Sequence, residues 1–271
     1  MPNMQINDVN VYYEVHGEGE PLLLIGGFNQ DVLGWFFQTT AYSQLYKVIV
    51  YDHRGVGRTE APDVPWSLEM MADDAAGLMA GLGIEKAHVL GWSMGGMIAQ
   101  ELALKYPARI SSLVLVSTFA SPYYPGLYIM EAGAKMLQEG VSQKTYSQFL
   151  LPWINSEKFF EKPERVQKTL GIMIAHPYPQ SARAMFQLLD ASREQPFTRD
   201  RLGQITAPTL VIVGKQDILM PVKMSEEIAA GITNAELVVM DGAAHGVVME
   251  NWREFNQVVL DFLAKVVKME G

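Results

Sequence analysis

The chain has 271 residues, 49% of them hydrophobic, so it can bury a large core. Its formal net charge is −9 at pH 7 and it has no basic run, which argues against nucleic acid or an anionic membrane as a partner. The absence of cysteine excludes disulfides, thiolate nucleophiles and cysteine-based metal sites.

In chain order, the first part alternates apolar runs with segments of helical spacing. Residues 9–15 and 22–25 predict a hairpin, with a turn at 16–20 between them. Further apolar runs, typical of strands buried on both faces of a parallel sheet, occupy 48–51, 87–90 and 113–116. Apolar residues at helical spacing fill 70–82 and 98–105. The alternation predicts an open, doubly wound α/β sheet.

A different pattern extends from about residue 119 to about residue 206. Prolines interrupt short helical patterns there, and methionine and aromatic residues are frequent. Apolar runs typical of strands resume at 209–214 and 236–240, and a final segment has one apolar face. We therefore predict a core formed by residues 1–118 and 207–271, with residues 119–206 inserted as a helical cap.

The pentapeptide Gly91-Trp92-Ser93-Met94-Gly95 stands between a predicted strand and a predicted helix. Its glycines permit a sharp turn, because a Cβ there would collide with the neighbouring strand or helix. The turn exposes the hydroxyl of Ser93. The amides that follow lie in the first turn of a helix, where N–H groups are unpaired and the dipole favours negative charge. This arrangement predicts a site where a serine alkoxide forms and an oxyanion is stabilised.

A serine hydroxyl is a poor nucleophile near neutral pH, so Ser93 needs a general base. Of the five histidines, His245 is the best candidate, because it directly follows the strand predicted at 236–240. Strand ends in a parallel sheet share one edge, so His245 and Ser93 should lie together. We expect His53 to hold its own loop and His88 to be a core residue.

The base in turn needs a carboxylate that fixes its tautomer. Asp217 follows the predicted strand at 209–214 and is the best candidate, whereas Asp241 and Asp52 are weaker ones. The predicted catalytic group therefore appears in the chain order Ser93, Asp217, His245.

These segments resemble the α/β-hydrolase superfamily over essentially the whole chain. The pentapeptide 91–95 is similar to that family's nucleophile elbow, 214–217 and 242–245 match its acid and base segments, and 52–58 resembles its loop after the fourth strand. The resemblance implies a mostly parallel sheet of the eight-stranded type, flanked by helices and carrying a helical cap. Residues 93–97 and the cap look like the group of small carboxylesterases, enol-lactonases and non-haem haloperoxidases.

The resemblance also implies an oxyanion hole made by two backbone amides. One is that of Met94, and Phe28 is in register to supply the other. The loop before Phe28 departs from the family pattern, because Gly26-Gly27 replaces the usual His-Gly and removes a side chain that often braces the loop. Candidate pocket residues are Gly27, Trp92, Trp153, His176 and Val247. Core packing is the competing interpretation for Trp92, and an ordinary surface position for His176.

The predicted reaction is hydrolysis of a small or medium carboxylic ester or lactone through an acyl-enzyme intermediate. Alternatives with the same three residues are C–C bond hydrolysis and peracid formation, and a ligand-responsive signalling module is a non-enzymatic one. We expect no metal and no other cofactor, because histidine pairs at metal-ligand spacing and a dinucleotide fingerprint are missing from the sequence. The expected partners are the small ester and water, and the expected state is a cytoplasmic monomer or homodimer.

Overall fold

The structure, a computed structural model, describes residues 3–193 and 196–270. Its centre is an eight-stranded sheet in the order β1-β2-β4-β3-β5-β6-β7-β8. The strands are β1 (Asn3–Ile6), β2 (Val9–His16), β3 (Glu20–Ile25), β4 (Tyr46–Tyr51), β5 (Ala87–Trp92), β6 (Ile110–Val116), β7 (Thr209–Gly214) and β8 (Ala235–Met240). Antiparallel pairing joins β1 to β2 and β2 to β4, and all other pairs are parallel. The predicted fold class is therefore confirmed.

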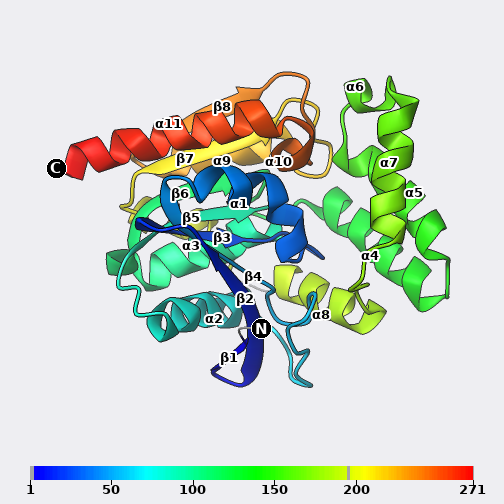
Figure 1. Cartoon of the computed structure of the whole chain (residues 1–271), viewed down its shortest axis with the longest axis horizontal. Coiled ribbons are helices and arrows are strands. Elements are labelled where there is room, and N and C mark those ends of the chain that lie inside the picture. Colours follow the sequence, from blue (N-terminus) through cyan, green and yellow to red (C-terminus); the bar gives the residue numbers. More distant parts are fainter. Residues whose placement is uncertain (1–2, 194–195, 271) are drawn as a thin grey trace.

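Helices cover both faces of this sheet (Figure 1). One face carries α1 (Phe36–Tyr42) and α11 (Trp252–Glu270), which contact each other, and the other carries α2 (Leu68–Gly81), α3 (Met94–Lys105) and α9 (Val222–Gly231). Alternate side chains of a strand point to opposite faces. Leu23 of β3 accordingly packs in the core cluster on the α3 side, and Leu24 in the cluster on the α11 side. The unbroken apolar strands thus supply both cores.

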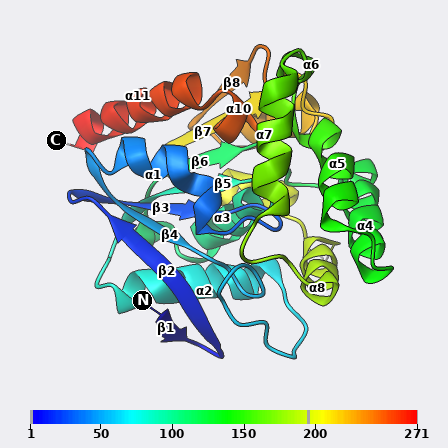
Figure 2. The same cartoon turned by 45° about the vertical axis from the view of Figure 1, so that its right-hand side comes forward.

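The segment between β6 and β7 consists of helices joined by loops, and it lies beside one edge of the sheet (Figures 1 and 2). Its helices are α4 (Tyr124–Gln138), α5 (Gln143–Ile154), α6 (Glu157–Phe160), α7 (Pro163–Ile174) and α8 (Ala182–Arg193). The same segment ends in the short helix η3 (Arg199–Gln204), and other short helices are η1 (Val32–Trp35), η2 (Pro107–Arg109) and α10 (Val247–Glu250). Here "cap" means residues 119–206; those boundaries stay a prediction.

The predicted hairpin at the start of the chain was wrong, because β4 lies between β2 and β3. The turn between β2 and β3 packs against the backbone just before β4 and does not join two paired strands. Gly17, at φ +74°, lies so close that a Cβ would stand 2.2 Å from the carbonyl oxygen of Ser43. Within the described residues, no helix is both long and apolar enough to span a bilayer.

Candidate active site

Ser93 occupies the junction between β5 and α3 in a strained conformation. Its backbone has φ +56° and ψ −122°, a region that residues other than glycine rarely adopt. The two flanking glycines are sterically required. A Cβ on Gly91 would lie 2.3 Å from the carbonyl oxygen of Gly95, and one on Gly95 would lie 2.2 Å from that of Ile25. The tight turn places the Ser93 side chain at the carboxyl edge of the sheet.

Ser93, His245 and Asp217 form a hydrogen-bonded line across this edge. The Ser93 Oγ lies 3.0 Å from His245 Nε2, and His245 Nδ1 lies 2.9 Å from Asp217 Oδ2. All three residues are at least 93% buried. Because a carboxylate only accepts, the proton on the neutral imidazole belongs on Nδ1, which leaves Nε2 to accept the Ser93 proton. The structure therefore brings the three predicted side chains together in a geometry that can activate a serine.

The two weaker acid candidates have other partners. Asp241 is exposed and pairs with Lys215 at 2.8 Å. Asp52 is buried and accepts hydrogen bonds from the amides of Val32 and Arg58. Burial raises the pKa of Asp52 to about 6. The carboxylate that faces His245 is thus that of Asp217.

The loop after β3 passes directly beside the candidate nucleophile. A Cβ on Gly27 would lie 3.1 Å from the Cβ of Ser93, so a side chain at position 27 would crowd the nucleophile. Phe28 follows in the loop, and Met94 is the first residue of α3. Across residues 3–193 and 196–270, no acceptor pairs with the amide N–H of Phe28 or of Met94. Both amides have the capacity that the predicted oxyanion hole requires.

The side chain of His53 contacts a second loop in addition to its own. We expected it to hold its own loop, and its carbonyl does accept a hydrogen bond from Val56 N–H. Its ring, however, crosses to the loop after β3, with Nε2 3.1 Å from the carbonyl oxygen of Gly27. Burial lowers the pKa of His53. The usable sequence signal was its position directly after a strand, at the same edge as Ser93.

The remaining pocket candidates have mixed surroundings. The Trp92 indole donates to the carbonyl oxygen of His245 at 3.0 Å, so this side chain both packs in the core and holds the His245 loop. Val247 is fully buried in the same core cluster. Trp153 packs beside Phe149 on α5. His176, at the junction of α7 and α8, is partly exposed, with Nε2 3.4 Å from a carboxylate oxygen of Asp31.

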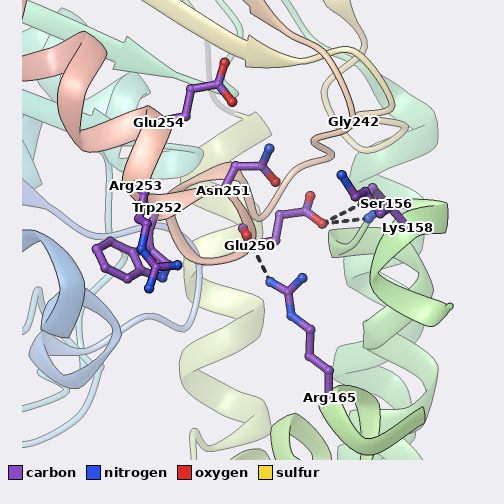
Figure 3. A pocket seen from close by; sticks show the side chains of 9 residues that line it. All are labelled: Ser156, Lys158, Arg165, Gly242, Glu250, Asn251, Trp252, Arg253 and Glu254. Carbon is purple, nitrogen blue, oxygen red and sulfur yellow. Dashed lines mark hydrogen bonds between the residues drawn. The ribbon is translucent and has the colours of Figure 1, made fainter. Parts of the chain in front are cut away.

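The contacts that join the cap to the His245 loop were not predicted from the sequence. Glu250 lines a pocket between the cap and the start of α11, together with the other side chains drawn in Figure 3. The volume of this pocket is about 270 Å³. One oxygen of the Glu250 carboxylate accepts from Ala244 N–H, and the other accepts from Ser156 N–H and hydroxyl. The amide of Gly246 donates to Ile154. Cap residues therefore bond to both neighbours of His245 in the chain, one directly and one through Glu250.

Within the described residues, no group of histidine, aspartate and glutamate side chains is arranged to hold a metal ion.

Comparison with known proteins gives consistent matches along the chain. The family model described as the alpha/beta hydrolase fold matches residues 20–251. A protein named putative carbamate hydrolase RutD, from Azorhizobium caulinodans, is 32% identical over 98% of this chain and 99% of its own length. Its namesake from Variovorax paradoxus is 32% identical over 94% and 97%.

Two solved structures are similar in fold as well as in sequence. The enol-lactonase from Burkholderia xenovorans LB400 has a TM-score of 0.86 and 26% identity, over 97% of this chain and 100% of that one. A thermophilic esterase from Thermogutta terrifontis has a TM-score of 0.86 and 28% identity, over 98% and 99%.

Proposed function

This chain belongs to the α/β-hydrolase fold family, and on that premise we propose that it hydrolyses a small or medium carboxylic ester or lactone through an acyl-enzyme on Ser93. The observation that carries the proposal is the hydrogen-bonded line from Ser93 through His245 to Asp217. The similar enol-lactonase and esterase structures support the choice of a carboxylic acyl group.

In the first step, His245 Nε2 takes the Ser93 proton while Oγ attacks the substrate carbonyl carbon. Asp217 remains ionised, holds the proton on Nδ1 and stabilises the imidazolium that forms. Asp217 is itself fixed, because its other carboxylate oxygen accepts from the amide of Met220 at 2.8 Å. A base oriented in this way loses little entropy in reaching the transition state.

The attack places negative charge on the carbonyl oxygen. The amides of Met94 and Phe28 would receive this oxygen, each contributing roughly 3–4 kcal/mol of transition-state stabilisation by analogy with other acyl-transfer sites. The N-terminus of α3, which begins at Met94, adds a favourable dipole.

Collapse of the tetrahedral intermediate expels the leaving alcohol, which takes its proton from the His245 imidazolium. A water molecule then gives a proton to the same nitrogen and attacks the acyl carbon, and Ser93 leaves as the alcohol. His245 thus alternates between base and acid, and the enzyme returns to its starting state.

A carbamate is the second candidate substrate, because two relatives named carbamate hydrolases share 32% identity with almost the whole chain. The same steps apply to a carbonyl that carries nitrogen in place of carbon. The nitrogen lone pair makes that carbonyl less electrophilic, so acyl-enzyme formation and hydrolysis would both be slower than for an ester.

The test is steady-state hydrolysis of p-nitrophenyl esters from acetate to dodecanoate, a p-nitrophenyl carbamate and an aliphatic lactone, with Ser93→Ala in parallel. We expect sustained turnover that requires Ser93, with a chain-length optimum set by the cap. Preference for the carbamate would select the second candidate. A single stoichiometric burst, or no Ser93-dependent reaction with any substrate, would contradict both and favour C–C cleavage or a signalling role.

A further inference from the structure

The Gly27 peptide is held from both sides by hydrogen bonds. Its N–H donates to the side-chain oxygen of Gln30 at 3.1 Å. Its carbonyl oxygen accepts from the Gln30 amide at 3.1 Å and faces His53 Nε2 at 3.1 Å. A carbonyl oxygen has two lone pairs, so both donors can be accommodated at once.

The direction of the Gly27 carbonyl determines the direction of the next amide. The carbonyl of Gly27 and the N–H of Phe28 belong to one peptide group, which is planar and trans, so the two bonds point in opposite directions. Donors that fix the Gly27 oxygen on one side therefore aim the Phe28 N–H toward the other. Phe28 is the residue proposed to supply the second oxyanion donor.

Of the two donors, only His53 anchors the loop to another part of the fold. Gln30 lies three residues from Gly27, so its bonds shape the turn but move with it. His53 follows β4, lies 26 residues further along the chain, and is 2% exposed. Because Nε2 faces a carbonyl, that nitrogen carries the proton of the neutral ring. Its bond therefore ties the turn to the edge of the sheet.

Position 26 has no space for a side chain that could hold the turn as His53 does. A Cβ on Gly26 would lie 2.7 Å from the backbone oxygen of Gln30, which the side chain could only avoid if the turn opened. The turn around Gly27 and a side chain at position 26 are therefore mutually exclusive. In this chain the bracing imidazole comes from a different loop.

We propose that His53 is a positioning residue for acyl transfer, which aims the Phe28 amide at the oxyanion through its hydrogen bond to the Gly27 carbonyl. The inference rests on the proposed function, because it concerns the same reacting centre. It predicts that loss of the Nε2–H donor weakens transition-state stabilisation and leaves ground-state binding almost unchanged.

The test compares three variants at position 53 with the wild-type enzyme. His53→Leu removes the donor, His53→Gln keeps a donor at nearly the distance of Nε2 from the backbone, and His53→Asn keeps an amide that ends near Nδ1. His88→Leu is the matched control, because His88 is also 2% exposed but bonds to Ser112 and Glu20 on strands. The readouts are kcat, KM and the inhibition constant of an alkylboronic acid, which forms a tetrahedral anion on the serine.

We expect His53→Leu and His53→Asn to lower kcat about 10- to 100-fold with KM within about threefold, a part of what loss of a whole oxyanion donor costs. Boronic acid affinity should fall by a similar factor. His53→Gln should recover most of both, and His88→Leu should lower only thermal stability. If His53→Leu does not fold, the Asn and Gln pair carries the same comparison.

Unchanged kcat and unchanged boronic acid affinity in the folded Leu or Asn variant would overturn the proposal, as would an equal loss in the Gln variant. Failure of the proposed function is separate, since it would appear as absent Ser93-dependent turnover in the wild-type enzyme. In that case the boronic acid adduct still reports whether His53 aims the amide.

Discussion

Glu250 is the residue whose replacement most directly probes the connection between the cap and His245. Its carboxylate bridges Ala244, which directly precedes His245, and Ser156, at the start of α6 (Figure 3). Both partner residues are 2% exposed, so in the folded protein their amides depend on this carboxylate as acceptor. Each orphaned buried donor costs about 1–3 kcal/mol.

Glu250→Ala orphans the two amides and the Ser156 hydroxyl, so we expect it to lower the free energy of unfolding by about 3–5 kcal/mol. Glu250→Gln keeps one acceptor oxygen but turns an NH₂ group toward a donor, and should cost about 1–3 kcal/mol. A shift of His245 by even 1 Å changes its geometry with Ser93, so kcat of the folded Gln variant should fall about 10-fold or more.

The assays are urea unfolding and steady-state ester hydrolysis at a temperature where every variant is folded. Glu254→Gln is the matched control, because Glu254 lines the same pocket on α11 and its substitution should change stability by less than about 0.5 kcal/mol. If Glu250→Gln and Glu254→Gln changed the free energy of unfolding and kcat by equal amounts, this reasoning would be refuted.

Further predictions concern Gly95, Gly171, Asp217 and Asp52. Gly95→Ala should destabilise the protein by about 3 kcal/mol or more, because the new Cβ would meet a backbone carbonyl of β3. Gly171→Ala should stabilise it by about 0.5–1 kcal/mol, because the space around this position on α7 is open and alanine favours a helix more than glycine does. Urea unfolding measures both changes. Asp217→Asn should lower kcat about 10³-fold or more, whereas Asp241→Asn should remain near wild type; the opposite ranking in ester hydrolysis would reassign the acid. Burial raises the pKa of Asp52 from its ordinary value of 3.8 to about 6, so the native state keeps this proton to higher pH than the unfolded chain does. The free energy of unfolding of the wild type should therefore fall relative to that of Asp52→Asn as pH rises from 4 to 6. The fall should reach up to about 3 kcal/mol, measured by unfolding titrations across that pH range. A pH-independent difference between the two proteins would contradict this last prediction.

The parts of the fold that could be predicted from the sequence are those fixed by local pattern. The apolar strands and the glycine-bounded turn at Ser93 depend on neighbouring residues, and the structure has them where they were expected. Strand pairing depends on distant residues, and the hairpin prediction failed because the inserted partner, β4, lies more than twenty residues after β3. The short strand β1 was missed although Asn3–Ile6 alternates polar and apolar residues, because an alternation of only four residues is a weak strand signal.

The site divides in the same way. Ser93, Asp217 and His245 could be placed together because each follows a parallel strand, and such ends share one edge. The contacts that hold these residues in place could not be predicted. Ser156, the cap residue that bonds to Glu250, lies 94 residues away in the chain, and its position depends on where α5 ends. The bond from His53 to Gly27 likewise depends on two loops that only the folded sheet brings together.

The proposed function requires that Ser93 becomes acylated during turnover. Its most direct test is rapid quenching of the reaction with a p-nitrophenyl ester, followed by mass spectrometry of the peptide that contains Ser93. We expect this peptide to gain the mass of the acyl group at Ser93 early in the reaction and to lose it as the substrate is exhausted. The adduct should never form in Ser93→Ala or His245→Ala. Sustained turnover with Ser93 unmodified, or an adduct on another residue that decays at the rate of turnover, would contradict the proposed function.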